Sequence, residues 1–84
     1  MKRMSKTIHG GEQKVLCSLL VELRTTAQLR QEDIAEKLGK PQSFVSKYES
    51  GERRLDVLEL RAVCWALGTT LSNFVVEFER KLKR

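Results

Sequence analysis

Apolar residues recur along this chain in five stretches, at the spacing that makes one face of an α-helix apolar. In the first stretch, residues 12–26, leucines stand at positions 16, 19, 20 and 23, which is the i, i+3, i+4, i+7 pattern. Similar patterns predict helices over 29–38, 41–50 and 55–67, and a fifth helix that begins at Leu71 with Thr70 as its cap. One proline and five glycines fit a mainly helical protein. We therefore expect an all-α fold of five helices.

The 84 residues are enough for one small domain. Residues 1–11 contain the pair Gly10-Gly11 and little apolar content, which predicts a flexible N-terminal tail. The folded domain is expected at 12–79, followed by a basic C-terminal tail at 80–84. A domain of this size buries only a modest fraction of its surface, so a partner that adds core is expected.

Glycine and proline mark the breaks between the predicted helices. Gly39, Gly51 and Gly68 each follow an apolar periodic stretch, where a left-handed residue commonly ends a helix. Pro41 is expected in the first turn of the next helix, because its missing N–H costs nothing there. The stretch around Gly39 thus predicts two short helices joined by a tight turn.

The second helix of that pair, 41–50, separates into an apolar and a polar face. With Val45 toward the core, Tyr48 lies on the same side. The outward face carries small, polar and basic residues: Ser43, Ser46, Lys47 and Ser50, with Gln42 at the N-terminal end. Phe44 falls between the faces and has two interpretations, packing beside Tyr48 or apolar contact with a thymine methyl or a sugar.

The last two helices carry more apolar surface than a small core needs. The inward face of 55–67 is expected to hold Leu55, Leu58 or Val57, Leu60, Val63, Cys64 and Leu67. Trp65 lies off this face. A wide core face with one surface aromatic would explain the excess, but we favour a homodimer contact. The residues expected in that contact are Trp65, Phe74, Val75, Phe78 and Leu82.

The net charge of +5 comes from the two ends of the chain. Three cations lie within the first six residues and four within the last five, whereas 12–79 holds nine basic and eleven acidic side chains. The overall charge is therefore weak support for binding to nucleic acid. The local distribution is more informative, since Lys40, Lys47, Arg53 and Arg54 gather around the helix at 41–50.

Other classes of site find little support in the sequence. Cys17 and Cys64 lie inside apolar helical patterns and are expected to be buried and free, and His9 is the only histidine, so no metal site is predicted. No cofactor motif and no nucleophile with a neighbouring base occurs, so we do not expect an enzyme. No apolar run has membrane-spanning length and no signal-type segment is present, which predicts a cytoplasmic protein with no membrane contact.

The stretch LRQEDIAEKLGKPQSFVSKYESGERR resembles the DNA-binding helix-turn-helix of the Cro and phage-repressor family, also called the XRE family of transcriptional regulators. The residues that carry the resemblance are Leu29, Gln31, Ile34, Ala35, Gly39, Glu49 and Gly51. It implies a five-helix lambda-repressor-like domain whose second and third helices form the motif. It also implies a homodimer that binds double-stranded DNA at an inverted repeat.

The resemblance assigns roles to individual residues. The base readers would be Gln42, Ser43, Ser46 and Lys47, and the phosphate contacts would be Gln31, Arg30, Lys40, Ser50, Arg53 and Arg54. Arg24 and Glu49 would form a partly buried bridge that orients the base-reading helix. Two residues depart from the family pattern: Arg30 replaces the usual Ser or Thr cap, and Gln28 stands where the family often has glycine.

The sequence leaves several roles open. Within the family, a phage repressor, a restriction-modification controller and a DNA-binding antitoxin with a protein partner are all compatible with one such domain. A helical domain of this kind can also act as a protein-interaction module, with the outward face of the helix at 41–50 docking on protein. The slightly acidic body of the chain and Phe44 favour that alternative.

Overall fold

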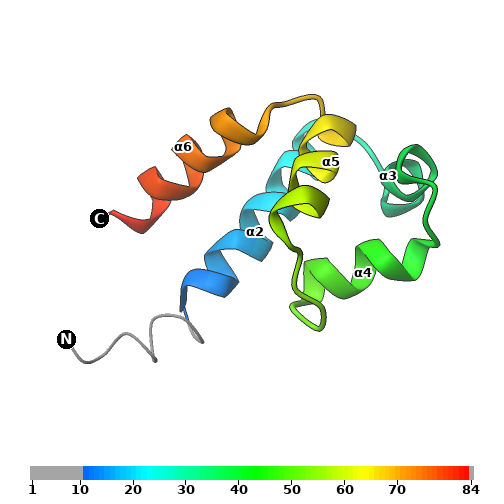
Figure 1. The fold of residues 1–84 in the computed structure, drawn as a ribbon, viewed down its shortest axis with the longest axis horizontal. Helices are drawn as coiled ribbons and strands as arrows, with labels where there is room; N and C mark the ends of the chain where they lie inside the picture. The colour runs from blue at the N-terminus through cyan, green and yellow to red at the C-terminus, as the bar shows by residue number, and fades with distance from the viewer. Residues whose placement is uncertain (1–10, 84) are drawn as a thin grey trace.

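The structure is a computed structural model that describes residues 11–83, and these residues form five α-helices and no strand (Figure 1). The helices are α2 (Gly11–Thr26), α3 (Gln31–Leu38), α4 (Gln42–Ser50), α5 (Val57–Leu67) and α6 (Leu71–Leu82). The all-α prediction and the number of helices are confirmed. Most of the predicted N-terminal tail lies outside the described residues, and its last residue, Gly11, already belongs to α2.

Several helix boundaries differ from those predicted. Arg80 and Lys81, expected in a basic tail, lie in the last turn of α6, which continues to Leu82. Pro41 is the N-cap of α4 and not a residue of its first turn. The helix at 29–38 begins two residues late, at Gln31, because Arg30 is the extended cap residue. These shifts leave the order and number of helices unchanged.

Hydrogen bonds between cap residues and first-turn residues explain where three of the helices begin. Asp56 and Glu59 cap α5 reciprocally: the Asp56 Oδ1 accepts the Glu59 N–H at 2.7 Å, and the Glu59 Oε1 accepts the Asp56 N–H at 3.0 Å. Thr70 caps α6 as predicted, since its Oγ1 accepts the Asn73 N–H at 3.1 Å. Arg30 has no acceptor to offer α3, and the Asp33 carboxylate instead accepts the Arg30 N–H at 2.8 Å.

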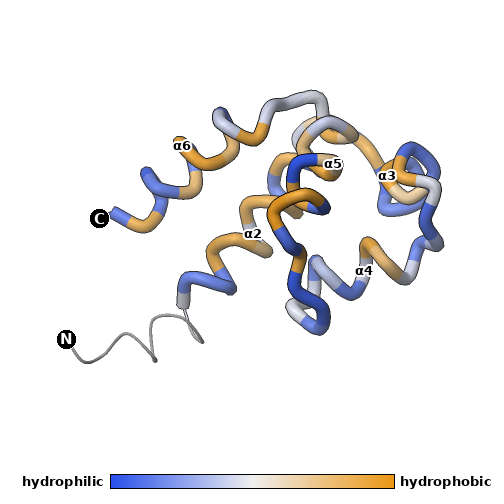
Figure 2. The backbone as a smooth tube through the Cα atoms, in the orientation of Figure 1, coloured by the Kyte–Doolittle hydropathy of each residue, from blue (hydrophilic) through white to orange (hydrophobic). Residues whose placement is uncertain are grey.

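The core is made by the inner faces of all five helices. Its buried members are Leu19, Leu20, Ile34, Ala35, Val45, Tyr48, Val63, Cys64, Ala66 and Phe74. α3 packs against α4 and α5, while α2 packs against α4 and α6, so α4 is held from two sides. Figure 2 shows apolar segments through α2, α5 and α6 and a polar loop between α4 and α5. Both cysteines are buried and free, as predicted.

Two predictions about apolar residues were wrong. Val57 and Leu58 were alternatives for the inward face of α5, but their side chains are 63% and 75% exposed. The helix begins only at Val57, so its first turn projects beyond the core and the buried face starts later, around Val63. Phe74 was predicted at a dimer contact, but it is 1% exposed because its ring lies in the chain's own core, 6.3 Å from the ring centroid of Phe78.

The turn between α2 and α3 contains the one non-glycine residue of 11–83 with positive φ. Gln28 has a φ of 61°, and its N–H bonds the Thr25 carbonyl at 2.9 Å. A side chain in this left-handed region crowds its own backbone, whereas glycine does not. Gln28 therefore departs from a family pattern that often has glycine here, and it adopts the left-handed conformation at a cost in strain.

Replacing Gln28 with glycine is expected to stabilise the fold by about 0.5–1 kcal/mol, because the strain at positive φ outweighs the added freedom of the unfolded chain. Urea unfolding followed by circular dichroism measures the change. Ala27→Gly is the matched control, since Ala27 is exposed and lacks a positive φ, and this variant should lose stability. A loss of stability in both variants would contradict the strain argument.

Candidate nucleic-acid interface

The turn at Gly39 sets the angle between α3 and α4. Gly39 has a φ of 67°, and its N–H bonds the Glu36 carbonyl at 3.2 Å, while the Lys40 N–H bonds the Ala35 carbonyl at 3.0 Å. These two bonds close the end of α3 and reverse the chain within three residues. The small, buried side chain of Ala35 allows the two helices to approach closely. The result is a helix-turn-helix (Figure 1).

The outward face of α4 carries the residues that helical periodicity predicted for it. Gln42, Ser43, Lys47 and Ser50 are exposed, and Ser46 is half-buried. The hydroxyls of Ser46 and Ser50 donate to the carbonyls of Ser43 and Lys47 at 3.2 and 3.1 Å. The Ser50 oxygen also accepts the Glu52 N–H at 3.4 Å, whereas the Ser46 oxygen accepts no hydrogen bond within residues 11–83. This face presents hydrogen-bonding groups and one cation without a large apolar side chain.

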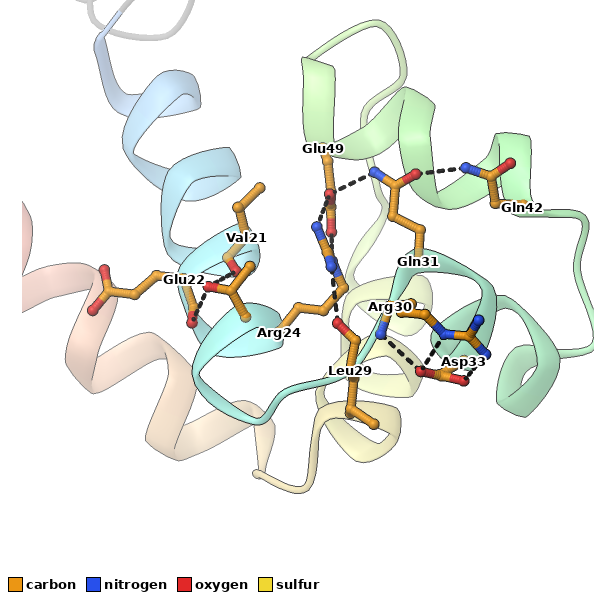
Figure 3. A network of polar contacts seen from close by, with 10 residues as sticks. Val21, Glu22, Arg24, Leu29, Arg30, Gln31, Asp33, Gln42 and Glu49 are labelled. Atoms are coloured by element: carbon orange, nitrogen blue, oxygen red, sulfur yellow. Dashed lines mark hydrogen bonds and ion pairs between the residues drawn. The ribbon is translucent and has the colours of Figure 1, made fainter.

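The predicted bridge between Arg24 and Glu49 is present. The Arg24 Nε and Nη2 donate to the two oxygens of Glu49 at 2.7 and 3.0 Å, and Nη1 donates to the Leu29 carbonyl at 2.9 Å (Figure 3). The two side chains are 14% and 6% exposed. Hydrogen bonding to Glu49 is the main reason that the pKa of Arg24 lies above its usual value. One side chain of α2 thus fixes both α4 and the start of α3.

The bridge continues through two amides to the N-terminal end of α4. The Gln31 Nε2 donates to the Glu49 Oε1 at 2.8 Å, and the Gln42 Nε2 donates to the Gln31 Oε1 at 2.6 Å (Figure 3). Because the carboxylate only accepts, it sets the direction of the Gln31 amide, and Gln31 in turn orients Gln42. Sequence reasoning placed both glutamines at the interface but missed their contact, which depends on how closely α3 and α4 approach.

Replacing Arg24 with alanine is expected to cost about 3 kcal/mol of folding stability, because it leaves the buried carboxylate of Glu49 unpaired. Chemical denaturation of the two proteins measures the difference. Arg30→Ala is the matched control: Arg30 pairs with Asp33 at 3.1 Å at the exposed surface, so its loss should be much smaller. An unchanged unfolding midpoint in Arg24→Ala would refute the role of the bridge.

A second polar cluster lies at the other side of α4, around Phe44. The Phe44 ring contacts Tyr48 edge to face, with centroids 5.6 Å apart, which supports the packing interpretation of this residue. The guanidinium of Arg53 lies 4.7 Å from the Phe44 centroid and the ammonium of Lys40 lies 5.4 Å from it. Arg53 also donates to both oxygens of Glu59, at 3.1 and 2.9 Å.

Glu59 was not among the predicted site residues, although a signal for it exists in the sequence. The spacing Asp56-x-x-Glu59 is a capping box, which places the glutamate carboxylate at the start of α5 beside the preceding loop. The hydrogen bond from Arg53, followed by that from the Asp56 N–H, lowers the pKa of Glu59 to about 2. Arg53 is therefore already paired, in contrast to the exposed Arg54.

The pKa of Glu59 should rise toward the usual carboxyl value of 4.5 in an Arg53→Ala variant. Because the folded protein has the lower pKa, the pair stabilises it fully above about pH 4.5, and this contribution disappears as the pH falls toward 2. Carboxyl chemical shifts followed by NMR titration give the pKa. Asp33, paired with Arg30 at the start of α3, is the internal reference, and its lowered pKa should be the same in both proteins.

Exposed apolar residues gather on α5 and α6, away from the polar face of α4. Leu58 and Trp65 stand seven residues apart on one face of α5, with the exposed Arg61 and Ala62 between them. Trp65 is 67% exposed, Val75 and Val76 are also exposed, and Phe78 and Leu82 are half-buried. These residues, with Phe74 excluded, form the candidate contact surface for a partner.

Residues 11–83 hold no cluster of histidine, cysteine and acidic side chains that could bind a metal. None of the helices in the same range is long and apolar enough to cross a membrane.

Comparison with known proteins gives matches that span nearly the whole chain. Residues 20–74 match the model of a family described as helix-turn-helix. The XRE-family like protein from Pseudomonas syringae pv. tomato is 41% identical, with a TM-score of 0.86, over 96% of this chain and 99% of that one. No curated protein matches this chain.

Two further solved structures share the fold at lower identity. The restriction-modification controller protein C.Esp1396I is 17% identical, with a TM-score of 0.82 over 90% of this chain and all of that one. The clp gene regulator ClgR from C. glutamicum is 21% identical, with a TM-score of 0.74 over 84% of this chain and 91% of that one. The controller is also known as a tetramer in complex with its natural 35-base-pair operator.

Proposed function

Because this chain belongs to the XRE family of helix-turn-helix transcriptional regulators, we propose that it binds a specific DNA sequence as a homodimer, with α4 in the major groove. The observation that carries this proposal is the hydrogen-bonded chain from Arg24 through Glu49 and Gln31 to Gln42. It runs from the core to the N-terminal end of the exposed helix. A side chain that is oriented before binding loses less entropy when it meets its ligand.

The side chains on the outward face of α4 suit base edges. A glutamine amide can pair with adenine through two hydrogen bonds, and Gln42 has its amide oxygen and one N–H without a partner among residues 11–83. Lys47 can donate to the acceptors of guanine, and Ser43 and Ser46 can donate or accept. We assign base readout to these four residues.

The residues around this face suit the DNA backbone. Lys40, Ser50 and Arg54 are exposed on either side of α4, and Arg30 remains largely exposed at the start of α3 despite its bond to Asp33. Gln31 lies between Glu49 and Gln42 and can turn part of its amide toward a phosphate. Contacts of this kind fix the position of the protein on the duplex without reading its sequence.

A second copy of the chain supplies the contacts that one short helix lacks. Nine residues of α4 reach only a few base pairs, and two-fold dimers place two such helices about 34 Å apart on an inverted repeat. Trp65, Val75, Phe78 and Leu82, extended by Leu58, form the surface that we assign to the dimer. The tetrameric controller on its operator supports an oligomeric DNA-bound form.

Selection of bound sequences from a random DNA pool tests the proposal directly. The expected result is a palindromic site whose half-sites are about one helical turn apart, since the dimer is two-fold symmetric. If no sequence is enriched, and if the affinity for DNA does not depend on salt concentration, the protein-interaction alternative is favoured.

Lys47→Ala and Arg54→Ala each remove one cation, but they should act differently on DNA. Lys47→Ala is expected to relax the preference at one base of each half-site. The free energy of binding to a site with the preferred base should become less favourable by about 1–3 kcal/mol. Arg54→Ala should weaken binding to all sequences and lower the slope of log K against log salt by about 0.9 per protomer. Mobility shifts with specific and random duplexes at two salt concentrations separate these outcomes. Equal losses on both duplexes for both variants would contradict the assignment.

Trp65→Glu should convert the dimer to a monomer, because a charge placed in an apolar contact loses its hydration without a partner. Sedimentation at several protein concentrations measures the association. Ser18→Glu, which adds the same charge at an exposed position of α2, should leave the dimer intact. A wild-type chain that stays monomeric at high concentration and on DNA would contradict the proposed dimer.

A further inference from the structure

The side chain of Arg53 is fixed by three hydrogen bonds and a contact with an aromatic ring, although it belongs to a loop. Its Nη1 donates to the Arg54 carbonyl at 3.1 Å and to the Glu59 Oε1 at 3.1 Å, and its Nη2 donates to the Glu59 Oε2 at 2.9 Å. The guanidinium plane also lies over the Phe44 ring. A long, surface-exposed side chain normally samples many rotamers, so this arrangement restricts the position of one cation.

Two contacts also link Arg53 directly to α4. The backbone N–H of Arg53 donates to the Lys47 carbonyl at 3.1 Å, and the ring beneath the guanidinium comes from Phe44 of that helix. Lys47 and Phe44 lie one turn apart along α4. The position of the Arg53 side chain is therefore fixed relative to the residues of α4 that are assigned to base readout.

One edge of the guanidinium remains open. Of its five N–H groups, three are used by Glu59 and the Arg54 carbonyl, and the Nε–H and the second Nη2–H make no hydrogen bond within residues 11–83. These two N–H groups point along one side of the plane, which is the fork that binds two oxygens of a phosphate. The ammonium of Lys40 lies on the same Phe44 ring, so a second cation stands close to Arg53.

We propose that Glu59 is a positioning residue for DNA binding, which holds Arg53 across Phe44 so that the free edge of its guanidinium clamps a backbone phosphate beside α4. This inference rests on the proposed function and adds a residue that does not itself touch DNA. Glu59 acts through Arg53 in the way that an outer carboxylate orients a metal-binding histidine. The clamp joins the phosphate contact to the base-reading helix and so helps to fix its register on the duplex.

The direction in which Glu59→Gln changes the affinity for DNA distinguishes this positioning role from a simple effect of charge. Removing a carboxylate close to DNA reduces repulsion and ordinarily tightens binding. If Glu59 positions Arg53, Glu59→Gln must instead weaken binding, because Arg53 loses its fixed geometry. The glutamine oxygen can still accept the Asp56 N–H and keep the cap of α5, and thermal unfolding checks that the variant is folded.

The experiment measures the affinity of the full chain for its selected duplex by fluorescence anisotropy, between about 50 and 200 mM salt. For Glu59→Gln we expect a loss of roughly 3- to 10-fold and a slope of log K against log salt lower by about 0.9 for each phosphate contact released. Arg53→Gln should give a similar loss and slope, and the double variant should be no weaker than Arg53→Gln alone. Glu77→Gln, which breaks the Arg80 pair on α6, is the matched control and should bind as the wild type does.

Glu59→Asp provides a second measure, since it keeps the charge but shortens the side chain by one carbon. It should also weaken binding, whereas an effect of charge alone would leave the affinity unchanged. Binding by Glu59→Gln that is equal to or tighter than wild type, with an unchanged or steeper salt slope, overturns the positioning role. A wild-type chain with no salt-dependent DNA binding overturns the proposed function as well, so the two failures are distinguishable.

Discussion

The buried carboxylate of Glu49 is the group on which the geometry of the candidate interface depends. It accepts two bonds from Arg24 and one from Gln31, and so connects α2, α3 and α4 at a single point. A buried ion pair adds little net stability, because desolvation offsets most of the attraction. Its value here is directional: an apolar contact of the same volume would hold the helices together but would not orient the amides of Gln31 and Gln42.

The net charge of the chain gives little information about the interface, and the local arrangement explains why. The segment 12–79 is slightly acidic, yet several of its carboxylates are paired with arginines, as in Arg24 with Glu49 and Arg53 with Glu59. Such pairs cancel charge while fixing the position of a guanidinium. Lys40, Lys47 and Arg54 make no ion pair within residues 11–83, and they lie on the face of α4 and in its flanking loops, where a local excess of positive charge can attract phosphate.

Much of the fold followed from the sequence, because helix formation depends on residues three and four positions apart. The glycines at 39, 51 and 68 and the Thr70 cap could be read directly, and the Arg24–Glu49 bridge followed from the family resemblance. The contacts of Gln31 with Gln42, and of Arg53 with Glu59 and Phe44, depend on the distance and rotation between elements, which periodicity does not specify. The error at Phe74 has the same origin, since one apolar face of α6 could serve either a core or a partner.

The burial of Phe74 also has a consequence for how such a protein can change. It is the only fully buried side chain of α6, and Phe78 and the pair of Lys81 with Glu22 of α2 add the remaining attachment of the helix to the domain. The Glu49 network, at the opposite side of the molecule, shares no residue with that attachment. In the proposed dimer, substitutions on the outer surface of α6 would therefore change which chains associate without changing the residues assigned to DNA readout. On that proposal, two copies of such a protein could evolve into regulators that do not form mixed dimers, through a few changes in α6 alone.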